Sequence, residues 1–565
     1  MLCEKCNASI PDASSNSSPK FSSSLQNLLR AENSLTSSDT SEIQDIIAGL
    51  DVDTARIRWE LISLTNKLKR LEIQRAKYKS LLAPIRRLPS EILNLIFTHF
   101  SCNPDVQNNT YITDYDGVSL PGYSLMAVCS HWRNIALSCT ALWRKIWIGA
   151  TLYNTEEALN KLARLAAPLK WCLDHAGETI EISFRAYIDG EDTPVPEPEF
   201  MRILFAQPGR WRHLDLTLIN FTNLDNFPSF AALKNCALTS LKSLQFSFDH
   251  EVEFDIFCNA PQLTQLTLGT LPAATVERKE IFPWGQIKTL ELLFDHYPNY
   301  ELFRALAFCP GLESLSYVFS YDNNNESSEI PPQFSETIRS LSVLFTSGHI
   351  FSKTFSLLID AACFLALQEM SINYNPDAEQ VPRDILWPQD KVTSFLLRSG
   401  CSLTTLEIEN IIISNDDLVA LLVNTPELRR FNFYEGPMTE TKEEEEGGTL
   451  ASEPEHITMS FIARLHAYGD IEDGGPHGFA NPLIPKLEHL SLRALADWFN
   501  VDQLFIDVIC SRWSPEPGVV AMTGIECLKS VKLQVLGRDL NEEVYRPLIQ
   551  LRKAGLQLEL IGTVH

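Results

Sequence analysis

The chain has 565 residues, of which 45% are hydrophobic and 10% aromatic, a composition typical of globular proteins and long enough for several domains. Asp and Glu outnumber Lys and Arg by 72 to 47, which gives a formal net charge of -25 at pH 7. A field of this sign repels phosphate backbones and argues against nucleic acid as a partner. No apolar run approaches the roughly 18 residues of a membrane helix, which argues against a membrane partner.

The first forty residues are rich in Ser, Asn and Asp and contain few large apolar residues, so we predict a disordered tail over residues 1–40. This segment lacks the basic and apolar parts of a secretory signal, which favours a cytosolic or nuclear address. The thirteen scattered Cys indicate free thiols rather than disulfides. Cys3 and Cys6 form a single CxxC pair, compatible with a zinc or redox site or with two ordinary thiols. We predict no metal and no cofactor for the rest of the chain.

Residues 41–83 carry apolar side chains at alternating intervals of three and four, without an internal Pro. This heptad pattern predicts a coiled-coil helix that ends before Pro84. Its seam consists of Leu50, Thr54, Ile57, Leu61, Leu64, Leu68, Leu71, Arg75, Tyr78 and Leu82.

Charges are sorted along this helix: acidic residues lie early, from Glu42 to Asp53, and basic residues lie late, from Lys67 to Lys79. Two arrangements fit the pattern. The helix either lays its seam on the rest of the protein, or it associates with a second copy. An antiparallel pair would place acidic halves against basic halves, whereas a parallel pair would oppose like charges.

The stretch RRLPSEILNLIF, residues 86–97, begins a short helix whose apolar residues cover an arc of roughly 200° when placed at 100° per residue. That arc is wider than a helix with one packed face needs, so part of it is available to another surface. Downstream, SLMAVCSHWRNIALSCTALWRKIWI predicts a second helix and a third that carries Trp. Residues 84–148 therefore form a small three-helix module.

The order and spacing of Leu88-Pro89, Glu91-Ile92-Leu93, Ile96-Phe97, Val128-Cys129, Trp132-Arg133, Ile135-Ala136 and Leu142-Trp143 resemble the F-box family, in particular the F-box proteins of mushroom-forming fungi. The departure from the pattern is a long acidic loop over residues 101–123, which we expect to bulge out. The resemblance implies a module that docks on a Skp-type adaptor and, through it, on cullin and RING subunits of a ubiquitin ligase. The residues implied for docking, some of which must form the module's own core, are Leu88, Pro89, Ile92, Leu93, Ile96, Phe97, Val128, Cys129, Trp132 and Trp143.

Residues 149–565 repeat one apolar pattern, for example Leu263/Leu266/Leu268 and Leu312/Leu315/Tyr317, at intervals of 22 to 30 residues in the early part. This period is that of leucine-rich repeats. Intervening segments such as 415–431 have helical spacing. The predicted fold is thus α + α/β: a coiled-coil helix, a three-helix F-box, and an irregular leucine-rich-repeat solenoid interrupted by an acidic loop insertion over residues 436–485.

Between the inward residues of each predicted strand lie polar ones that form the outward face of the sheet. A graded polar surface on a rigid curved sheet suits the binding of a target protein, although a solvated sheet face is the simpler interpretation for any single residue. The residues we assign to target binding are Glu291, Glu369, Glu407, Glu409, Arg430, Tyr434, His489 and Arg493.

Motifs for catalysis were sought without success: the sequence has no nucleophile elbow, no phosphate-binding Gly loop and no His pair at metal spacing. We therefore expect a non-catalytic substrate receptor of an SCF-type ligase. Two alternatives stay open, a repeat scaffold assembled through its coiled coil outside a ligase and an unrecognised hydrolase on a solenoid.

Overall fold

The computed structural model describes residues 37–102, 110–114, 117–152, 155–188, 196–219, 227–248, 254–269, 271, 282–294, 300–320, 330–346, 351–375, 387–436, 457–467, 482–496, 499–514 and 524–563. The chain divides into two compact units, of which the first ends at Leu93 and the second begins at Asn94. Most of the predicted tail, with Cys3 and Cys6, and most of the predicted acidic insertion lie outside the described residues.

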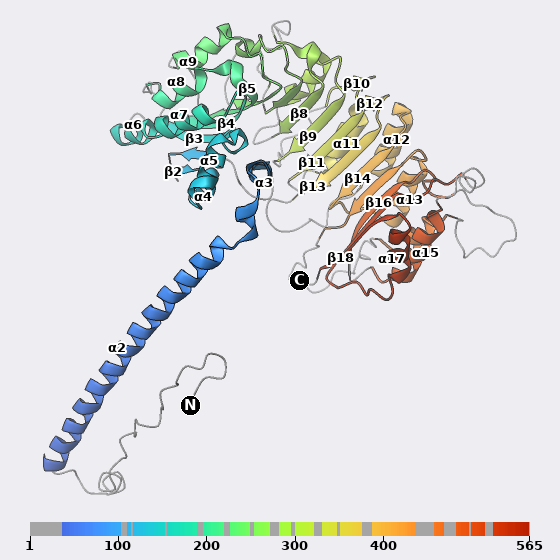
Figure 1. The fold of residues 1–565 in the computed structure, drawn as a ribbon. Helices are drawn as coiled ribbons and strands as arrows, with labels where there is room; N and C mark the ends of the chain where they lie inside the picture. The colour runs from blue at the N-terminus through green and yellow to red at the C-terminus, as the bar shows by residue number, and fades with distance from the viewer. Residues whose placement is uncertain are drawn as a thin grey trace. The chain divides into compact units, whose positions relative to one another are not determined.

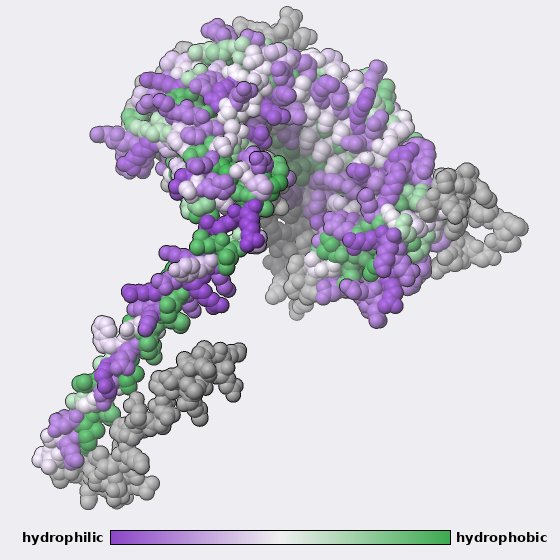
Figure 2. Space-filling model, viewed as in Figure 1, coloured by the Kyte–Doolittle hydropathy of each residue, from purple (hydrophilic) through white to green (hydrophobic). Residues whose placement is uncertain are grey.

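The first unit is dominated by one long helix, α2 (Ser37–Leu81), of 45 residues (Figure 1). The predicted helix is confirmed, and it begins four residues before the predicted start. The large apolar residues of the seam are between 42% and 75% exposed, and Figure 2 shows apolar side chains spaced along the exposed helix. A short 3-10 turn, η2 (Pro84–Arg87), follows the end of α2, because the Pro84 ring cannot continue an α-helix.

The helix α3 (Ser90–Cys102) crosses the division between the units. In the second unit it is followed by α4 (Pro121–Met126), α5 (Ser130–Ser138) and the 3-10 turn η3 (Thr140–Leu142). Trp143, directly after η3, is fully buried and contacts α4 and α5. Its indole N–H donates to the carbonyl of Ala136 at 2.8 Å, and its ring lies where a Cβ on Gly122 would stand, 2.2 Å from the nearest ring atom. Only glycine at position 122 leaves room for this ring.

The described residues of the second unit form a mixed sheet of sixteen strands, nearly all parallel, and a separate parallel pair. The order of neighbours in the large sheet follows the chain from β3 to β18, with helices and 3-10 turns between strands (Figure 1). This arrangement is compatible with an α/β solenoid. The strands are β1 (Thr110–Thr113), β2 (Gly117–Ser119), β3 (Lys145–Leu152), β4 (Ile180–Ile188), β5 (Trp211–Ile219), β6 (Ser243–Phe248), β7 (Gln265–Leu268), β8 (Thr289–Phe294), β9 (Ser314–Phe319), β11 (Ser340–Phe345), β13 (Glu369–Tyr374), β14 (Thr405–Glu409), β15 (Arg430–Tyr434), β16 (His489–Leu495), β17 (Ser530–Leu536), β18 (Gln557–Thr563) and the separate pair β10 (Gln333–Ser335) and β12 (Ala362–Phe364).

Inward residues of successive strands stand in register and make the core. One row runs through Leu290, Leu315, Leu341, Met370, Leu406, Phe431, Leu490, Val531 and Leu558. All of them are buried. Each buried aliphatic side chain of this size contributes about 1.5–3 kcal/mol to folding, so a repeated residue at a fixed strand position yields a continuous core. The predicted positions at which strands recur, from β5 to β17, are confirmed.

The return segments lie against the inward face of the sheet and pack on one another along it. They are α6 (Glu156–Ala163), α7 (Ala166–His175), α8 (Glu199–Phe205), η4 (Pro208–Arg210), α9 (Pro228–Ala231), η6 (Ala232–Asn235), η7 (Phe254–Phe257), η8 (Trp284–Gln286), η9 (Tyr300–Phe308), α11 (Phe351–Ala361), α12 (Gln389–Ser399), α13 (Asn415–Val423), α14 (Met459–Arg464), α15 (Asp502–Arg512) and α17 (Arg546–Lys553). Several are short because Pro, Gly and polar residues interrupt the helical pattern.

The predicted insertion over 436–485 is not entirely a loop. It contains α14, whose Phe461 and Ile462 are buried and which packs against α15. A short apolar turn, ITMSFIARL, is the return segment of this repeat. The sequence did not predict this helix, because acidic and Gly-rich residues flank it on both sides.

The predicted loop over residues 101–123 also departs from expectation. Its described part contains β1 and β2, which form an antiparallel hairpin, and β1 pairs in parallel with β3. This hairpin covers the edge of the sheet that β3 would otherwise expose. The strand β3 begins at Lys145, so it straddles the predicted boundary between the three-helix module and the repeats at 148/149.

Two further findings bear on the setting of the protein. Within the described ranges, no helix combines the length and the apolar character that a membrane span requires. The described cysteines are free thiols, and burial raises the pKa of Cys172 and of Cys309 to about 12, which keeps both protonated and unreactive.

Candidate protein-binding surfaces

The apolar arc of α3 has a buried part and an exposed part. Leu93 and Phe97 are fully buried, and the ring of Phe97 meets that of Trp132 edge to face, with centroids 5.1 Å apart. By contrast Ile92 is 42%, Leu95 56% and Ile96 41% exposed. These three residues are spaced three and one apart along the helix, so they form one apolar row on it. We call them the α3 row.

The other residues predicted for docking fall into the same two groups. Trp143 is fully buried and Trp132 is half-buried, whereas Val128, between α4 and α5, is 53% exposed. Before α3, Pro89 is exposed and Leu88 half-buried. Cys129, half-buried, precedes α5 as its N-cap residue. The tryptophans and the buried α3 residues are therefore core, and Ile92, Ile96 and Val128 can meet a partner. The predicted list omitted Leu95, although the arc pattern already placed it among the apolar residues.

Most of the residues predicted for target binding are joined into hydrogen-bonded networks across neighbouring strands. Arg493 on β16 forms an ion pair with Glu409 on β14, with Nη2 and Oε1 2.8 Å apart. Its guanidinium carbon also lies 5.2 Å from the centroid of the Tyr434 ring. The Tyr434 hydroxyl donates to Ser491 Oγ at 3.0 Å. Three predicted residues therefore meet at one place, and they satisfy one another.

The remaining predicted residues are spread along the sheet. Glu407 accepts hydrogen bonds from Ser371 at 3.2 Å and from Asn432 at 2.9 Å. Glu291, on a strand four positions away in the sheet, accepts one from Thr267 at 3.1 Å. These hydrogen bonds fix the orientation of each carboxylate on the sheet, while further acceptor sites on its two oxygens stay free.

At the C-terminal end of this face, His489 lies 2.7 Å from the hydroxyl of Ser530, and its partial burial lowers its pKa. Glu369 and Arg430 are exposed at the starts of their strands. These two are the freest charges of the predicted set, two strands apart in the same row of the sheet.

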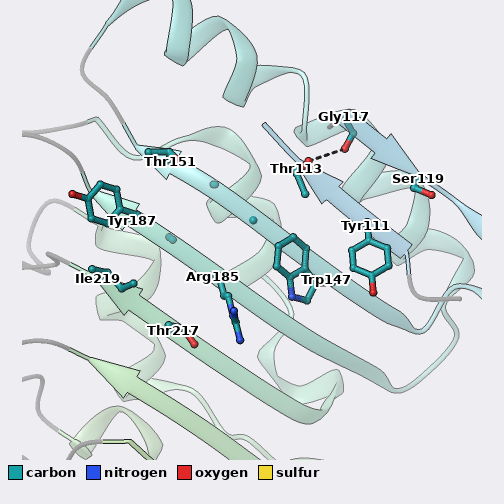
Figure 3. A pocket seen from close by; sticks show the side chains of 13 residues that line it. Tyr111, Thr113, Gly117, Ser119, Trp147, Thr151, Arg185, Tyr187, Thr217 and Ile219 are labelled. Carbon is teal, nitrogen blue, oxygen red and sulfur yellow. Dashed lines mark hydrogen bonds between the residues drawn. The ribbon is translucent and has the colours of Figure 1, made fainter. Parts of the chain in front are cut away.

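A pocket of about 600 Å³ lies at the other end of the sheet, over β1, β3, β4 and β5 (Figure 3). Its walls are the outward side chains of these strands, which alternate with the buried inward ones. Tyr111 and Trp147 form its aromatic side, with ring centroids 5.5 Å apart. Tyr187 and Ile219 stand at the opposite side, and Arg185 lies between the two groups. We call this the N-terminal pocket.

The backbone of β3 shapes the floor of the N-terminal pocket. The Trp147 ring lies across Gly149, where a Cβ would stand 2.6 Å from the indole. A larger residue at position 149 would push the ring out of place. The end of β1 is fixed to β3 by Asp114, whose Oδ2 accepts from the Thr151 N–H at 2.9 Å. The aromatic side is therefore held rigidly before any ligand arrives.

Chemically the N-terminal pocket offers apolar and aromatic surface with one exposed cation. Arg185 makes no ion pair with another described residue. Its charge acts to lower the pKa of the nearby Asp215, although burial raises that pKa by more. Threonine hydroxyls of residues 113, 151 and 217 line the space. Such a mixture accommodates an apolar or aromatic side chain next to an anionic group.

None of the pocket residues was predicted for binding. Trp147 had been assigned to the three-helix module, and Tyr111 to a bulging loop. Two signals in the sequence pointed to the place: Gly149 inside an apolar run, which indicates close approach to a strand, and aromatic residues at outward strand positions. The pairing of β1 with β3 that brings Tyr111 to Trp147 has no local signal.

In the described residues, no group of three or more His, Cys, Asp and Glu is placed to hold a metal ion. Comparison with known proteins finds no family model that matches the chain and no curated protein that matches it. Function must therefore be argued from the surfaces themselves.

Proposed function

We propose that this protein is a substrate receptor of an SCF-type ubiquitin ligase in the cytosol or nucleus. In this proposal α3, α4 and α5 are an F-box that binds a Skp-type adaptor, and the parallel sheet is an irregular leucine-rich-repeat domain that binds a target. Cullin and RING subunits join through the adaptor. Ubiquitin transfer then takes place on other subunits, and the chain contributes by bringing the target close to the conjugating enzyme.

The observation that carries the proposal is the α3 row. Ile92, Leu95 and Ile96 are exposed on a helix whose other apolar residues, Leu93 and Phe97, are fully buried. A helix in a globular protein normally exposes polar residues on its free side, and contiguous apolar surface marks an interaction site. The Leu-Pro entry and the spacing to Val128-Cys129 and Trp132 supply the family resemblance that names the adaptor.

Target binding is proposed for the N-terminal pocket rather than for the acidic residues of β14 and the basic residues of β16. Of these, Glu409 is paired with Arg493, and Glu407 accepts a hydrogen bond from Asn432, whereas Trp147 and Arg185 present unfilled surface. The expected target segment carries an apolar or aromatic side chain with a carboxylate or phosphate within reach of Arg185.

Binding of a purified Skp-type adaptor to the full-length chain tests the first part. We expect the parent chain to bind, and Leu95→Asp and Ile96→Asp to weaken binding at least tenfold, because a charge would be buried in an apolar interface. Asn94→Asp is the matched control, since it adds the same carboxylate at an exposed neighbour on α3. Circular dichroism establishes that each variant is folded. Absence of adaptor binding by the parent chain would reject the proposal, as would equal loss in Asn94→Asp.

The second part is tested with the same preparations. Proteins captured with the parent chain from cell extract are compared with those captured by Trp147→Ala. A true target is lost from the variant while the adaptor is retained, because the N-terminal pocket and the α3 row involve different residues. Loss of both would point to misfolding, and retention of every captured protein would place target binding elsewhere.

A scaffold assembled through α2 outside a ligase is the alternative, and the exposed seam of α2 is the observation that favours it. The two functions separate in the adaptor experiment. A scaffold self-associates without binding the adaptor, whereas a ligase receptor binds the adaptor whether or not it self-associates.

A further inference from the structure

We infer that two copies of this chain associate through α2 as an antiparallel coiled coil. This inference does not depend on the proposed ligase function, because it concerns only the surface of one helix. It names the occupant of the exposed seam as a second copy of the same helix, in one orientation and one register.

The seam is the first part of the support for a second copy. The helix α2 is continuous over 45 residues. The alternation of the seam extends back to Ile47, and at the ten positions from Ile47 to Tyr78 only Thr54 and Arg75 are not large apolar residues. The apolar members are exposed. An isolated helix with such a stripe leaves its hydrophobic surface in water, and a partner helix with the same 3.5-residue repeat buries it.

The antiparallel register is the second part. We place Leu61 opposite Leu64 of the second copy. The two-fold symmetry then fixes the other layers: Ile57 faces Leu68, Thr54 faces Leu71, Leu50 faces Arg75, and Ile47 faces Tyr78. All positions from Ile47 to Tyr78 are then paired, and Leu82 lies beyond the end of α2. Beside the seam, Ile46 meets Leu81 of the second copy, so an additional apolar pair closes each end.

Arg75 decides between orientations. In a parallel pair it would face Arg75 of the second copy, where two guanidinium groups of like charge repel each other. In the antiparallel register it faces Leu50, and its long aliphatic stem can lie along that side chain while its charge reaches water. Arg75 is exposed and forms no ion pair with another described residue, so this position is free to adapt.

Charges beside the seam are the third part, and they are mixed. The antiparallel register brings Glu60 next to Lys67 of the second copy, which attracts, but Asp51 next to Glu72, which repels. A parallel pair would instead join Asp53 to Arg58 and Lys67 to Glu72. Such exposed pairs contribute little each, so the repulsion between two facing Arg75 side chains outweighs them.

Glu72 consequently gives a test with opposite outcomes for the two orientations. The change Glu72→Lys turns the repulsion with Asp51 into attraction in the antiparallel pair, at two symmetric places. In a parallel pair it turns the attraction with Lys67 into repulsion. The experiment is sedimentation equilibrium of the full-length chain over about 1–100 μM at low salt, with parent and variants compared.

We expect the parent chain to be a dimer and Glu72→Lys to lower its dissociation constant several-fold, with the gain shrinking at high salt. Leu64→Asp should abolish the dimer while circular dichroism keeps its helical signal. Asp45→Lys is the matched control, because it makes the same charge change on the outer side of α2 and should leave the dissociation constant nearly unchanged. A monomeric parent chain at 100 μM would overturn the inference, and so would weaker association in Glu72→Lys or an assembly larger than a dimer.

Discussion

At the scale of single residues, the buried side chain of Glu435 holds neighbouring segments together next to the predicted acidic insertion. Glu435, directly after β15, accepts backbone N–H bonds from Ile457 at 2.8 Å and from Leu495 at 3.2 Å. It thereby joins the start of the α14 segment to the end of β16. Burial raises its pKa to about 7, although both N–H bonds act in the opposite direction. Desolvation of the carboxylate is the larger effect.

A pH dependence of stability follows from this raised pKa. The folded chain binds a proton at Glu435 more readily than the unfolded chain, whose carboxyl titrates near ~4.3. The free energy of unfolding therefore decreases as pH rises from about 4.3 to about 7, by at most about 4 kcal/mol, and the contribution of Glu435 is constant at higher pH. We expect Glu435→Gln to remove this decrease, measured as the difference in urea midpoint between pH 5 and pH 8.

The matched control for this prediction is Glu369→Gln, which makes the same exchange at an exposed strand position. His213, His466 and His489 have pKa values lowered chiefly by burial, so they add a trend of opposite sign that all variants share. The comparison between Glu435→Gln and the parent chain isolates Glu435. An unchanged pH 5 to pH 8 difference in Glu435→Gln would show that its carboxylate is not desolvated.

At the scale of elements, the hairpin of β1 and β2 protects the first edge of the sheet. An uncovered parallel strand offers unpaired N–H and C=O groups to other chains. β1 occupies these groups on β3, and β2, exposed throughout, ends the sheet with only three residues. A short outermost strand is a poor template for further pairing.

Ile112 anchors this hairpin, since it is the fully buried residue at the centre of β1. We expect Ile112→Ala to lower the free energy of unfolding by about 2–4 kcal/mol and to increase aggregation, because the edge of β3 becomes accessible when the hairpin opens. Urea denaturation and light scattering on warming measure the two effects. Val118→Ala, on the exposed β2, should change stability by less than about 0.5 kcal/mol. Equal effects of the two substitutions would contradict a protective role of the hairpin.

Elements with strong local patterns were predictable from the sequence, and those made by distant pairing were not. The helical pattern of α2 and the strand triplets show their period within one segment, and the structure has a helix and strands at these places. The pairing of β1 with β3 joins residues separated by α4 and α5, so Tyr111 carries no local signal of its partner Trp147. The apolar residues of α14 did not predict a helix, because the acidic residues around them indicated a loop.

The same limit applies to the candidate sites. The wide arc on α3 predicted surplus apolar surface, but only packing shows that Leu93 and Phe97 are enclosed and Leu95 is free. Outward positions on the strands were predicted correctly, for example Glu409 and Arg493. Their mutual ion pair was not, because it spans two strand spacings between residues far apart in the chain.

At the scale of the whole molecule, the sheet of the second unit is built so that each strand contacts mainly its two neighbours in sequence. Stability in such an arrangement is approximately a sum of local contributions and neighbour interfaces. A destabilising substitution at one end of the sheet is therefore expected to lower stability only near that end. A substitution of Arg512 tests this expectation, because Arg512 is almost fully buried on α15.

The Arg512 guanidinium donates to the carbonyls of Leu465, Leu483 and Ile484, which lie on both sides of the Gly-rich stretch over residues 468–481. Burial lowers its pKa to about 10, so it stays charged at neutral pH. We expect Arg512→Met to leave three buried carbonyls without their donor and to lower the local free energy of opening by roughly 3 kcal/mol or more.

Hydrogen exchange measured by mass spectrometry locates the effect. In Arg512→Met, protection should fall in α14, β16 and β17 and stay as in the parent chain from β3 to β6, because no contact links those strands directly to Arg512. Arg552→Met, which removes an exposed guanidinium from α17, serves as the control and should leave all strands protected. A uniform loss of protection along the sheet would instead show that the second unit unfolds as one cooperative body, since neighbour-to-neighbour coupling would then extend over its full length.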